Sequence, residues 1–378
     1  MAKTSARSKT AKAAKPKSGH AKPGHAKPGH AKSGHAKPGH AKSASPLFGR
    51  LALIGLGLIG SSLARAARLR GLAGEITGCA RSAATRKTAL RLGLVDRMYQ
   101  DPAEAVKGAD LVVLCSPLGT YADIAARMGP ALKKGAIVSD VGSAKQCVIR
   151  DVGPHLPDGV HLVPGHPVAG TEHSGPEAGF AELFQGRWCI LTPTAEVPAA
   201  ATKRVAALWR GCGMQVAVMD PQHHDVVLAI TSHVPHVIAY TIVGTATRLG
   251  NEVRGEVFKY SAGGFRDFTR IAASDPVMWR DILLNNREPV LEMLQRFSED
   301  MAQLQRAIRW GEGEFLHDLF ERTRAIRRGV IAAGQAGSFI PNAPAAAPSE
   351  SRGRSKPRRP ARSRALSPAR RRRGPAAK

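Results

Sequence analysis

The sequence lacks closely spaced cysteines, and its five cysteines lie more than 20 residues apart from one another. No C-x-x-C or Cys/His spacing occurs, so a structural zinc site is not expected and we assign no metal. An odd number of scattered thiols fits a reducing compartment better than a disulfide framework.

Long hydrophobic runs are also missing. No apolar run approaches the roughly 18 residues that a membrane-spanning helix needs. The N-terminal region is basic but has no apolar core of the kind that signal peptides contain. We therefore expect a cytoplasmic protein with no membrane association.

Acidic residues are nearly absent from both ends, and this accounts for most of the net charge of +27. Residues 1–50 contain 12 Lys/Arg and no acid, residues 341–378 contain 12 Lys/Arg and one acid, and +4 remains for residues 51–340. A GHAKP/GHAKS repeat dominates the first end, and Arg, Pro, Ser and Ala dominate the second. Because neither offers apolar side chains to bury, we expect residues 1–46 and 336–378 to be disordered tails.

Two interpretations of the tails remain open. They are either solvated extensions with only nonspecific polyanion affinity, or nucleic-acid tethers that contact phosphates and would therefore be strongly salt-dependent. Residues 1–46 and 341–378 contain no Phe, Trp or Tyr to stack on bases, which argues against sequence-specific binding.

Between the tails, a glycine motif marks a nucleotide site. The apolar run Leu51–Ile54 is followed by the G-x-G-x-x-G motif Gly55-Leu56-Gly57-Leu58-Ile59-Gly60 and then by a helical pattern. In such a strand–turn–helix unit the first glycine permits the turn, the second admits a pyrophosphate and the third allows close packing. The helix N-terminus supplies N–H groups to the phosphates.

Further strand-like runs alternate with helical stretches, namely Glu75–Cys79, Asp110–Cys115, Ala136–Asp140 and Trp188–Thr192, with a last one at Met214–Met219. This alternation predicts a Rossmann-type doubly wound parallel sheet over residues 47–220. Ser116 and Pro117 follow a continuously apolar run and are expected at the ligand-binding edge of the sheet.

A carboxylate is missing where many NAD-binding proteins hold the adenosine ribose, about 20 residues beyond the glycines. Here Ala80 is followed by Arg81 and Ser82, which could receive a 2′-phosphate. The alternative is that Arg81 is a solvated loop residue. We expect NADP or dual use of NAD and NADP as the cofactor.

Four further motifs follow in order: Asp140-Val141-Gly142-Ser143-Ala144-Lys145, Gly165-His166-Pro167-Val168-Ala169-Gly170, Ser232-His233-Val234-Pro235-His236, and the block from Gly263-Gly264-Phe265-Arg266-Asp267-Phe268-Thr269-Arg270 to Trp279. Together they resemble the prephenate/arogenate (cyclohexadienyl) dehydrogenase family, known as TyrA, from about Leu47 to Val330. The resemblance implies oxidative decarboxylation of prephenate and/or arogenate with hydride transfer to NAD(P)⁺, in tyrosine biosynthesis.

That reaction suggests roles for individual residues. A neutral histidine suits acceptance of the substrate's hydroxyl proton, and His166 is our candidate. Carboxylate substrates need a fixed cation, and Arg270 offers a bidentate guanidinium. The resemblance adds Ser143 to this catalytic set. It also implies that Ser232, His236, Gly263 and Trp279 surround the substrate, with Thr171 and Glu172 at the pocket edge. His233 or His236 could instead be a packed core histidine.

From Asp225 to about Val330 the pattern is helical, with apolar faces between charged residues. We expect residues 221–335 to form an all-α substrate and dimerisation domain, and the resemblance likewise implies a homodimer. The rival interpretation is a nucleic-acid-associated protein in which a dehydrogenase-like body serves as a scaffold for basic tails.

Overall fold

The computed structural model describes residues 45–248, 255–256 and 259–332, so both predicted tails lie almost wholly outside the described residues. By its internal contacts the chain divides into residues 1–296 and residues 297–378. The domain limits inferred from the sequence stay a prediction.

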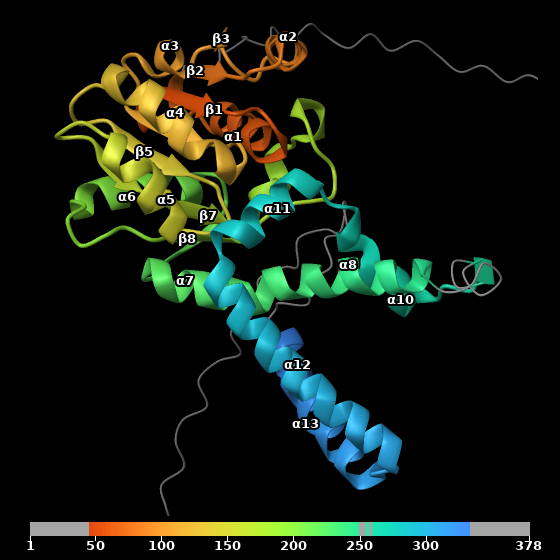
Figure 1. Ribbon diagram of the computed structural model, residues 1–378. Coiled ribbons are helices and arrows are strands. Elements are labelled where there is room, and N and C mark those ends of the chain that lie inside the picture. The colour runs from red at the N-terminus through yellow and green to blue at the C-terminus, as the bar shows by residue number, and fades with distance from the viewer. Residues whose placement is uncertain (1–44, 249–254, 257–258, 333–378) are drawn as a thin grey trace, which may run out of the picture. The chain divides into compact units, whose positions relative to one another are not determined.

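A six-stranded parallel sheet forms the centre of the first unit, with the strand order β3-β2-β1-β4-β5-β6 (Figure 1). Its strands are β1 (Phe48–Ile54), β2 (Ala73–Cys79), β3 (Arg97–Tyr99), β4 (Leu111–Leu114), β5 (Ile137–Asp140) and β6 (His161–Val163). Leu51 of β1 is in register with Ile76 on one side and Leu111 on the other. This order confirms the predicted Rossmann-type sheet and places its switch point between β1 and β4.

Helices cover both faces of this sheet. They are α1 (Leu58–Leu69), α2 (Ala83–Arg91), α3 (Pro102–Val106), α4 (Tyr121–Met128), α5 (Gln146–Val152) and α6 (Ala199–Gly211). Successive strand residues point to opposite faces. Leu51 and Leu53 therefore join the core beneath α1, α2 and α6, whereas Ala52 and Ile54 join the core beneath α3, α4 and α5.

Two predicted strands belong to a separate sheet, which corrects our expectation for Trp188–Thr192. In this second sheet β7 (Gly165–Pro167) pairs antiparallel with β8 (Trp188–Leu191), and β8 pairs parallel with β9 (Gln215–Val218). The apolar run of β8 could not reveal which sheet it joins, because the missed strand β7 contains only three residues. His166 is the middle residue of β7.

The first helix of this part begins at Pro221, four residues before the helical pattern that we read from Asp225, because Asp220 caps it by accepting from the N–H groups of Gln222 and His223. Its elements are α7 (Pro221–Leu228), η6 (Ala229–His233), α8 (Val234–Thr247), α10 (Gly263–Thr269), η7 (Arg270–Ala273), α11 (Pro276–Asn285), α12 (Arg287–Trp310) and α13 (Gly313–Ala332). The segment η6 is a π-helical turn. It precedes Pro235, which has no N–H to continue the regular helical ladder.

One continuous helical stretch, Pro221–Thr247, is long and apolar enough to cross a membrane, contrary to our expectation that no such run exists. Length and composition alone are weak evidence for a span, because core helices pass the same test. His224 and Asp225 in this stretch are buried, and Asp225 accepts hydrogen bonds from the start of α5. The helix is thus packed against the Rossmann-type domain through polar contacts.

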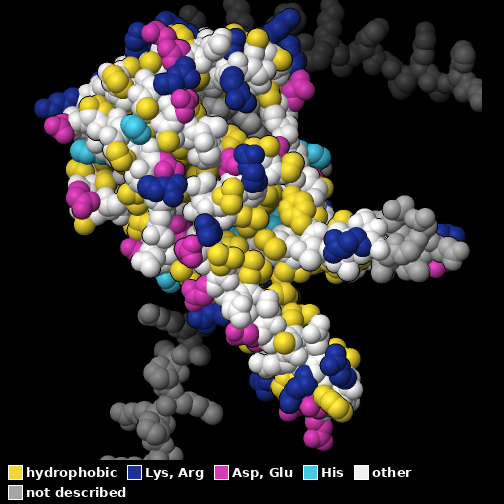
Figure 2. Space-filling model, in the orientation of Figure 1, with side chains coloured by type: hydrophobic (Ala, Val, Ile, Leu, Met, Phe, Trp, Pro, Cys, Tyr) yellow, Lys and Arg dark blue, Asp and Glu magenta, His cyan; other side chains and the backbone are white. Residues whose placement is uncertain are grey.

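Hydrophobic side chains also remain exposed on this helical part. Figure 2 shows them gathered along α8 and beside α11. Ile242 on α8 is 40% exposed and Leu284 on α11 is 66% exposed. Ile308 on α12 and Phe320 on α13, in the second unit, are exposed as well. A gathering of exposed apolar side chains such as that along α8 and beside α11 is typical of a protein–protein interface.

Candidate active site

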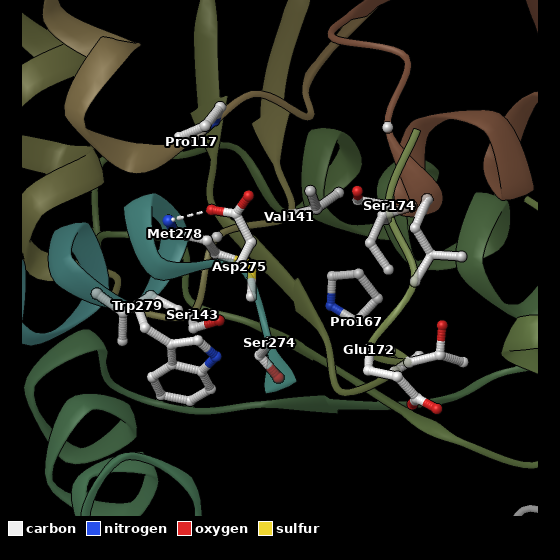
Figure 3. A pocket seen from close by; sticks show the side chains of 18 of the residues that line it. Pro117, Val141, Ser143, Pro167, Glu172, Ser174, Ser274, Asp275, Met278 and Trp279 are labelled. Carbon is white, nitrogen blue, oxygen red and sulfur yellow. Dashed lines mark hydrogen bonds between the residues drawn. The ribbon is translucent and has the colours of Figure 1, made fainter. Parts of the chain in front are cut away.

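A cavity of about 530 Å³ lies where β1, β4 and β5 end. Its lining comes from the glycine loop, the loops after β4 and β5, the segment from His166 to Gly175, and the helices η6, α8, η7 and α11. In the view of Figure 3, Trp279 and Ser143 lie on one side of the pocket and Pro167 and Glu172 lie on the other. The carboxyl edge of an open parallel sheet is the usual ligand site of such folds.

The three motif glycines have the backbone geometry that a dinucleotide requires. Gly55 has a φ of 103°, and a Cβ there would lie 2.8 Å from the backbone of Cys115. A Cβ on Gly60 would lie 2.2 Å from the Gly55 carbonyl oxygen. A Cβ on Gly57 would meet nothing within 4 Å, and Gly57 is the N-cap of α1 with no side-chain cap. The residues therefore fit a pyrophosphate placed against Gly57 and the free N–H groups of α1.

His166 lies on the pocket wall and is 7% exposed. Its Nδ1 atom is 2.9 Å from Nε2 of His224, whose Nδ1 is 2.8 Å from Oδ1 of Asp225. Burial, together with the nearby His224, Lys145 and His233, holds the pKa of His166 well below its usual value. The imidazole is consequently neutral at physiological pH and able to accept a proton.

Trp279 and His236 form an aromatic part of the pocket wall. Their rings stack with centroids 3.5 Å apart, and His236 Nδ1 lies 2.9 Å from the Ser232 carbonyl oxygen. The Trp279 indole N–H is buried and has no hydrogen-bond partner among the described residues. Burial lowers the pKa of His236, and Arg270 lowers it further. The wall therefore offers a flat surface and an unused N–H donor.

Two arginines line the pocket, Arg187 and Arg270, and the sequence motifs single out Arg270. Its Nη1 atom is 3.1 Å from Oε2 of Glu172, and the two side chains are 59% and 33% exposed. The pKa of Glu172 is lowered by its own backbone N–H and by Arg270. An exposed ion pair of this kind contributes little to stability, so Arg270 can readily release Glu172 and bind another anion.

The pocket brings together most of the residues singled out from the sequence. Those that line it are His166, Arg270, Ser143, Ser232, His236, Thr171, Glu172, Trp279, Gly57, Leu58, Ile59, Ser116 and Pro117. Gly55, Leu56 and Gly60 support the loop from behind, and Gly263, Arg81 and Ser82 are not among the lining residues. Ser82 caps α2 by accepting from the Thr85 N–H at 3.4 Å. His233, in contrast to His236, is fully buried beside Asn286, with 2.9 Å between its Nδ1 and Asn286 Nδ2.

Sequence reasoning missed His224 and Asp225 and gave Lys145 no role. Lys145 is fully buried, with its Nζ 2.6 Å from Asp140 Oδ2 and 2.7 Å from the Gly165 carbonyl oxygen. The only available signal was the pair His224-Asp225 near the start of an apolar helical pattern. The pairing with His166 spans 58 residues and could not be deduced from spacing.

Comparison with known proteins gives consistent matches. The prephenate dehydrogenase nucleotide-binding domain matches residues 63–218, and the prephenate dehydrogenase dimerisation domain matches residues 220–322. A cyclohexadienyl dehydrogenase of Zymomonas mobilis is 44% identical over 74% of this chain and 96% of its own length. A prephenate dehydrogenase of Bacillus subtilis is 32% identical over 74% and 76%.

Solved structures agree. The structure of prephenate dehydrogenase from A. aeolicus with hydroxyphenyl propionate and NAD⁺ is similar with a TM-score of 0.68 and 36% identity, covering 75% of this chain and 98% of the other. Synechocystis arogenate dehydrogenase is similar with a TM-score of 0.63 and 26% identity, covering 74% and 99%. None of these matches supports the nucleic-acid-scaffold alternative.

Proposed function

This chain belongs to the prephenate dehydrogenase family, and we propose that it acts on prephenate, arogenate or both with His166 as the base and Arg270 as the carboxylate-binding cation. The family activity is that of an NAD(P)-dependent oxidoreductase of tyrosine biosynthesis. The product is 4-hydroxyphenylpyruvate from prephenate and tyrosine from arogenate.

One observation carries the proposed chemistry, namely a buried neutral imidazole facing the same cavity as the glycine loop. A nicotinamide held by the glycine loop would supply the acceptor for the hydride that leaves the ring carbon bearing the hydroxyl. His166 accepts the hydroxyl proton as the hydride leaves. Breakage of the bond to the ring carboxylate then returns an electron pair to the ring, which becomes aromatic.

Arg270 and Trp279 are the two pocket residues that we propose to bind the substrate carboxylates. The Arg270 guanidinium can exchange Glu172, which it holds through one contact of 3.1 Å, for a substrate carboxylate that it binds in a bidentate pair. The free indole N–H of Trp279 is a second donor. Ser143, Ser232 and His236 line the same pocket and are proposed to orient the ring.

The cofactor is NAD or NADP, and we expect NADP or dual use. Arg86 is held by the Ala80 and Arg81 carbonyl oxygens, at 2.8 and 2.7 Å from its Nη1. The exposed guanidinium of Arg81 makes no such bond to another described residue, so it is the side chain that can meet a 2′-phosphate. A Michaelis constant for NAD far below that for NADP would defeat this expectation.

We propose a homodimer formed through the helical part. Support comes from the match to a dimerisation domain and from the exposed apolar side chains of α8 and α11. Light scattering at micromolar concentration should give twice the mass of the chain, and a monomeric mass would contradict the proposal. A cytoplasmic location is expected because all five cysteines are free. Nonspecific polyanion binding by the tails stays a prediction from the sequence, without support from the matches.

Steady-state reduction of NAD and of NADP, each with prephenate and with arogenate, tests the proposal. Turnover in at least one combination is expected, and the pattern assigns substrate and cofactor together. A folded protein without turnover in any combination would contradict the proposed function.

A further inference from the structure

Behind His166 lies a chain of buried polar side chains that the proposed reaction has not used. His224 is fully buried and Asp225 is 1% exposed. The contacts run from His166 Nδ1 to His224 Nε2 at 2.9 Å, and from His224 Nδ1 to Asp225 Oδ1 at 2.8 Å. This series of hydrogen-bonded side chains starts at His166, which lines the pocket, and ends at the carboxylate of Asp225.

The carboxylate fixes the direction of both hydrogen bonds. An ionised Asp225 can only accept, so the proton of neutral His224 must be on Nδ1. His224 Nε2 is then an acceptor, and His166 Nδ1 must carry the proton that it accepts. The Nε2 atom of His166 is left with a free lone pair, which is the form that a base facing the substrate requires.

Asp225 is itself held by the backbone. Its two carboxylate oxygens accept from the N–H groups of Lys145 at 2.7 Å and Gln146 at 3.0 Å, at the start of α5. The other charges nearby are already paired, because the ammonium group of Lys145 bonds to Asp140. His233 is bonded to Asn286 and is not in this chain. Asp225 is thus the anion in direct contact with His224, and it reaches His166 only through that imidazole.

The proposed reaction requires these hydrogen-bonded side chains to stabilise a protonated His166 for part of each turnover. The hydroxyl proton that His166 accepts is returned to the ring oxygen once carbon dioxide has left, so the overall reaction neither releases nor consumes a proton. In between, a buried site must hold an imidazolium, which is costly without a nearby anion. A second imidazole backed by a carboxylate reduces that cost.

We propose that His224 and Asp225 are positioning residues that keep His166 in the Nδ1–H form and stabilise its protonated state during turnover. The inference rests on the proposed role of His166 as the base. It assigns a function to two residues that do not line the pocket.

Two substitutions separate the parts of this proposal in the full-length protein. His224→Gln supplies an oxygen that accepts from His166 but cannot take up a proton, so kcat should fall by roughly 10²-fold or more with the substrate KM nearly unchanged. Asp225→Asn removes the anion, so kcat should fall and the acidic limb of its pH profile should move to lower pH. His223→Gln is the matched control, since His223 is adjacent in sequence but exposed, and it should retain wild-type kinetics.

Nitrogen-15 NMR of labelled histidine provides a readout that does not depend on turnover. The His166 signal should report the Nδ1–H tautomer in the wild-type protein and a mixture of tautomers in Asp225→Asn. An unchanged tautomer and an unchanged acidic limb in that variant would overturn the proposal. If Asp225→Asn does not fold, the kcat of His224→Gln provides the test, and a wild-type kcat in that variant overturns the proposal.

His166→Asn, assayed in parallel, distinguishes failure of the positioning role from failure of the proposed function. Loss of turnover in His166→Asn with full turnover in His224→Gln would leave the proposed function standing and remove only the positioning role. Full turnover in His166→Asn would instead contradict the proposed function itself.

Discussion

Replacing Gly57 by alanine should separate cofactor binding from folding. Gly57 has φ −84° and ψ −159°, a conformation that alanine adopts freely, and its Cβ would meet no atom within 4 Å. The lower entropy of the unfolded chain should then stabilise the protein by about 0.4–1 kcal/mol. The new methyl group points into the space where the pyrophosphate must approach, so at least one charge-assisted hydrogen bond should be lost.

Such a bond contributes about 1.5–3 kcal/mol, which corresponds to roughly 10- to 100-fold weaker cofactor binding. Titration of the cofactor by fluorescence and thermal unfolding of the same sample measure the two effects. Gly60→Ala is the matched control, because its Cβ would lie 2.2 Å from the Gly55 carbonyl oxygen and should lower the melting temperature. Wild-type cofactor affinity in Gly57→Ala would refute the proposed position of the pyrophosphate.

Four other outcomes are expected. His166→Asn should lower kcat by roughly 10²- to 10⁴-fold with little change in substrate KM, as followed by NADH or NADPH formation. Trp279→Phe keeps the stack on His236 but loses the unpaired N–H, so substrate KM should rise several-fold while cofactor KM stays constant. Arg270→Lys should raise substrate KM by at least tenfold, because a bidentate pair becomes a single contact; an unchanged KM would remove Arg270 from substrate binding. The pKa of His233 falls from 6.5 to about 4 through burial, so the unfolded chain takes up protons first as pH decreases. The free energy of unfolding should therefore fall by about 2 kcal/mol from this group between roughly pH 7 and pH 5, and His233→Gln should flatten that slope in urea titrations.

Four strands of the central sheet, β1, β2, β4 and β5, could be predicted from local patterns, whereas the three-residue strands β3 and β6 were missed. The run Leu111–Leu114 is apolar at every position, as a strand covered on both faces must be. The glycine motif predicts the turn that follows β1. Strand β7 could not be predicted, since three residues that include a proline carry no periodicity. Its partner β8 was consequently assigned to the wrong sheet.

Sequence motifs predicted most of the pocket-lining residues, but not the residues that hold them in position through hydrogen bonds. His166 and Arg270 lie in recognisable segments, and the fold brings both to one cavity. Asp225 supports His166 only through His224, and its contacts with Lys145 and Gln146 join residues about 80 positions apart. Sequence patterns report local periodicity, so a hydrogen bond across that distance is visible only once the chain is folded.

The most direct test of the account is NAD(P)-dependent turnover of prephenate and arogenate by the wild-type protein and by His166→Asn side by side. The account predicts reduced cofactor and carbon dioxide in equal amounts from the wild type, and cofactor binding without appreciable turnover from the variant. Equal turnover by both proteins, or none by a folded wild type, would contradict it.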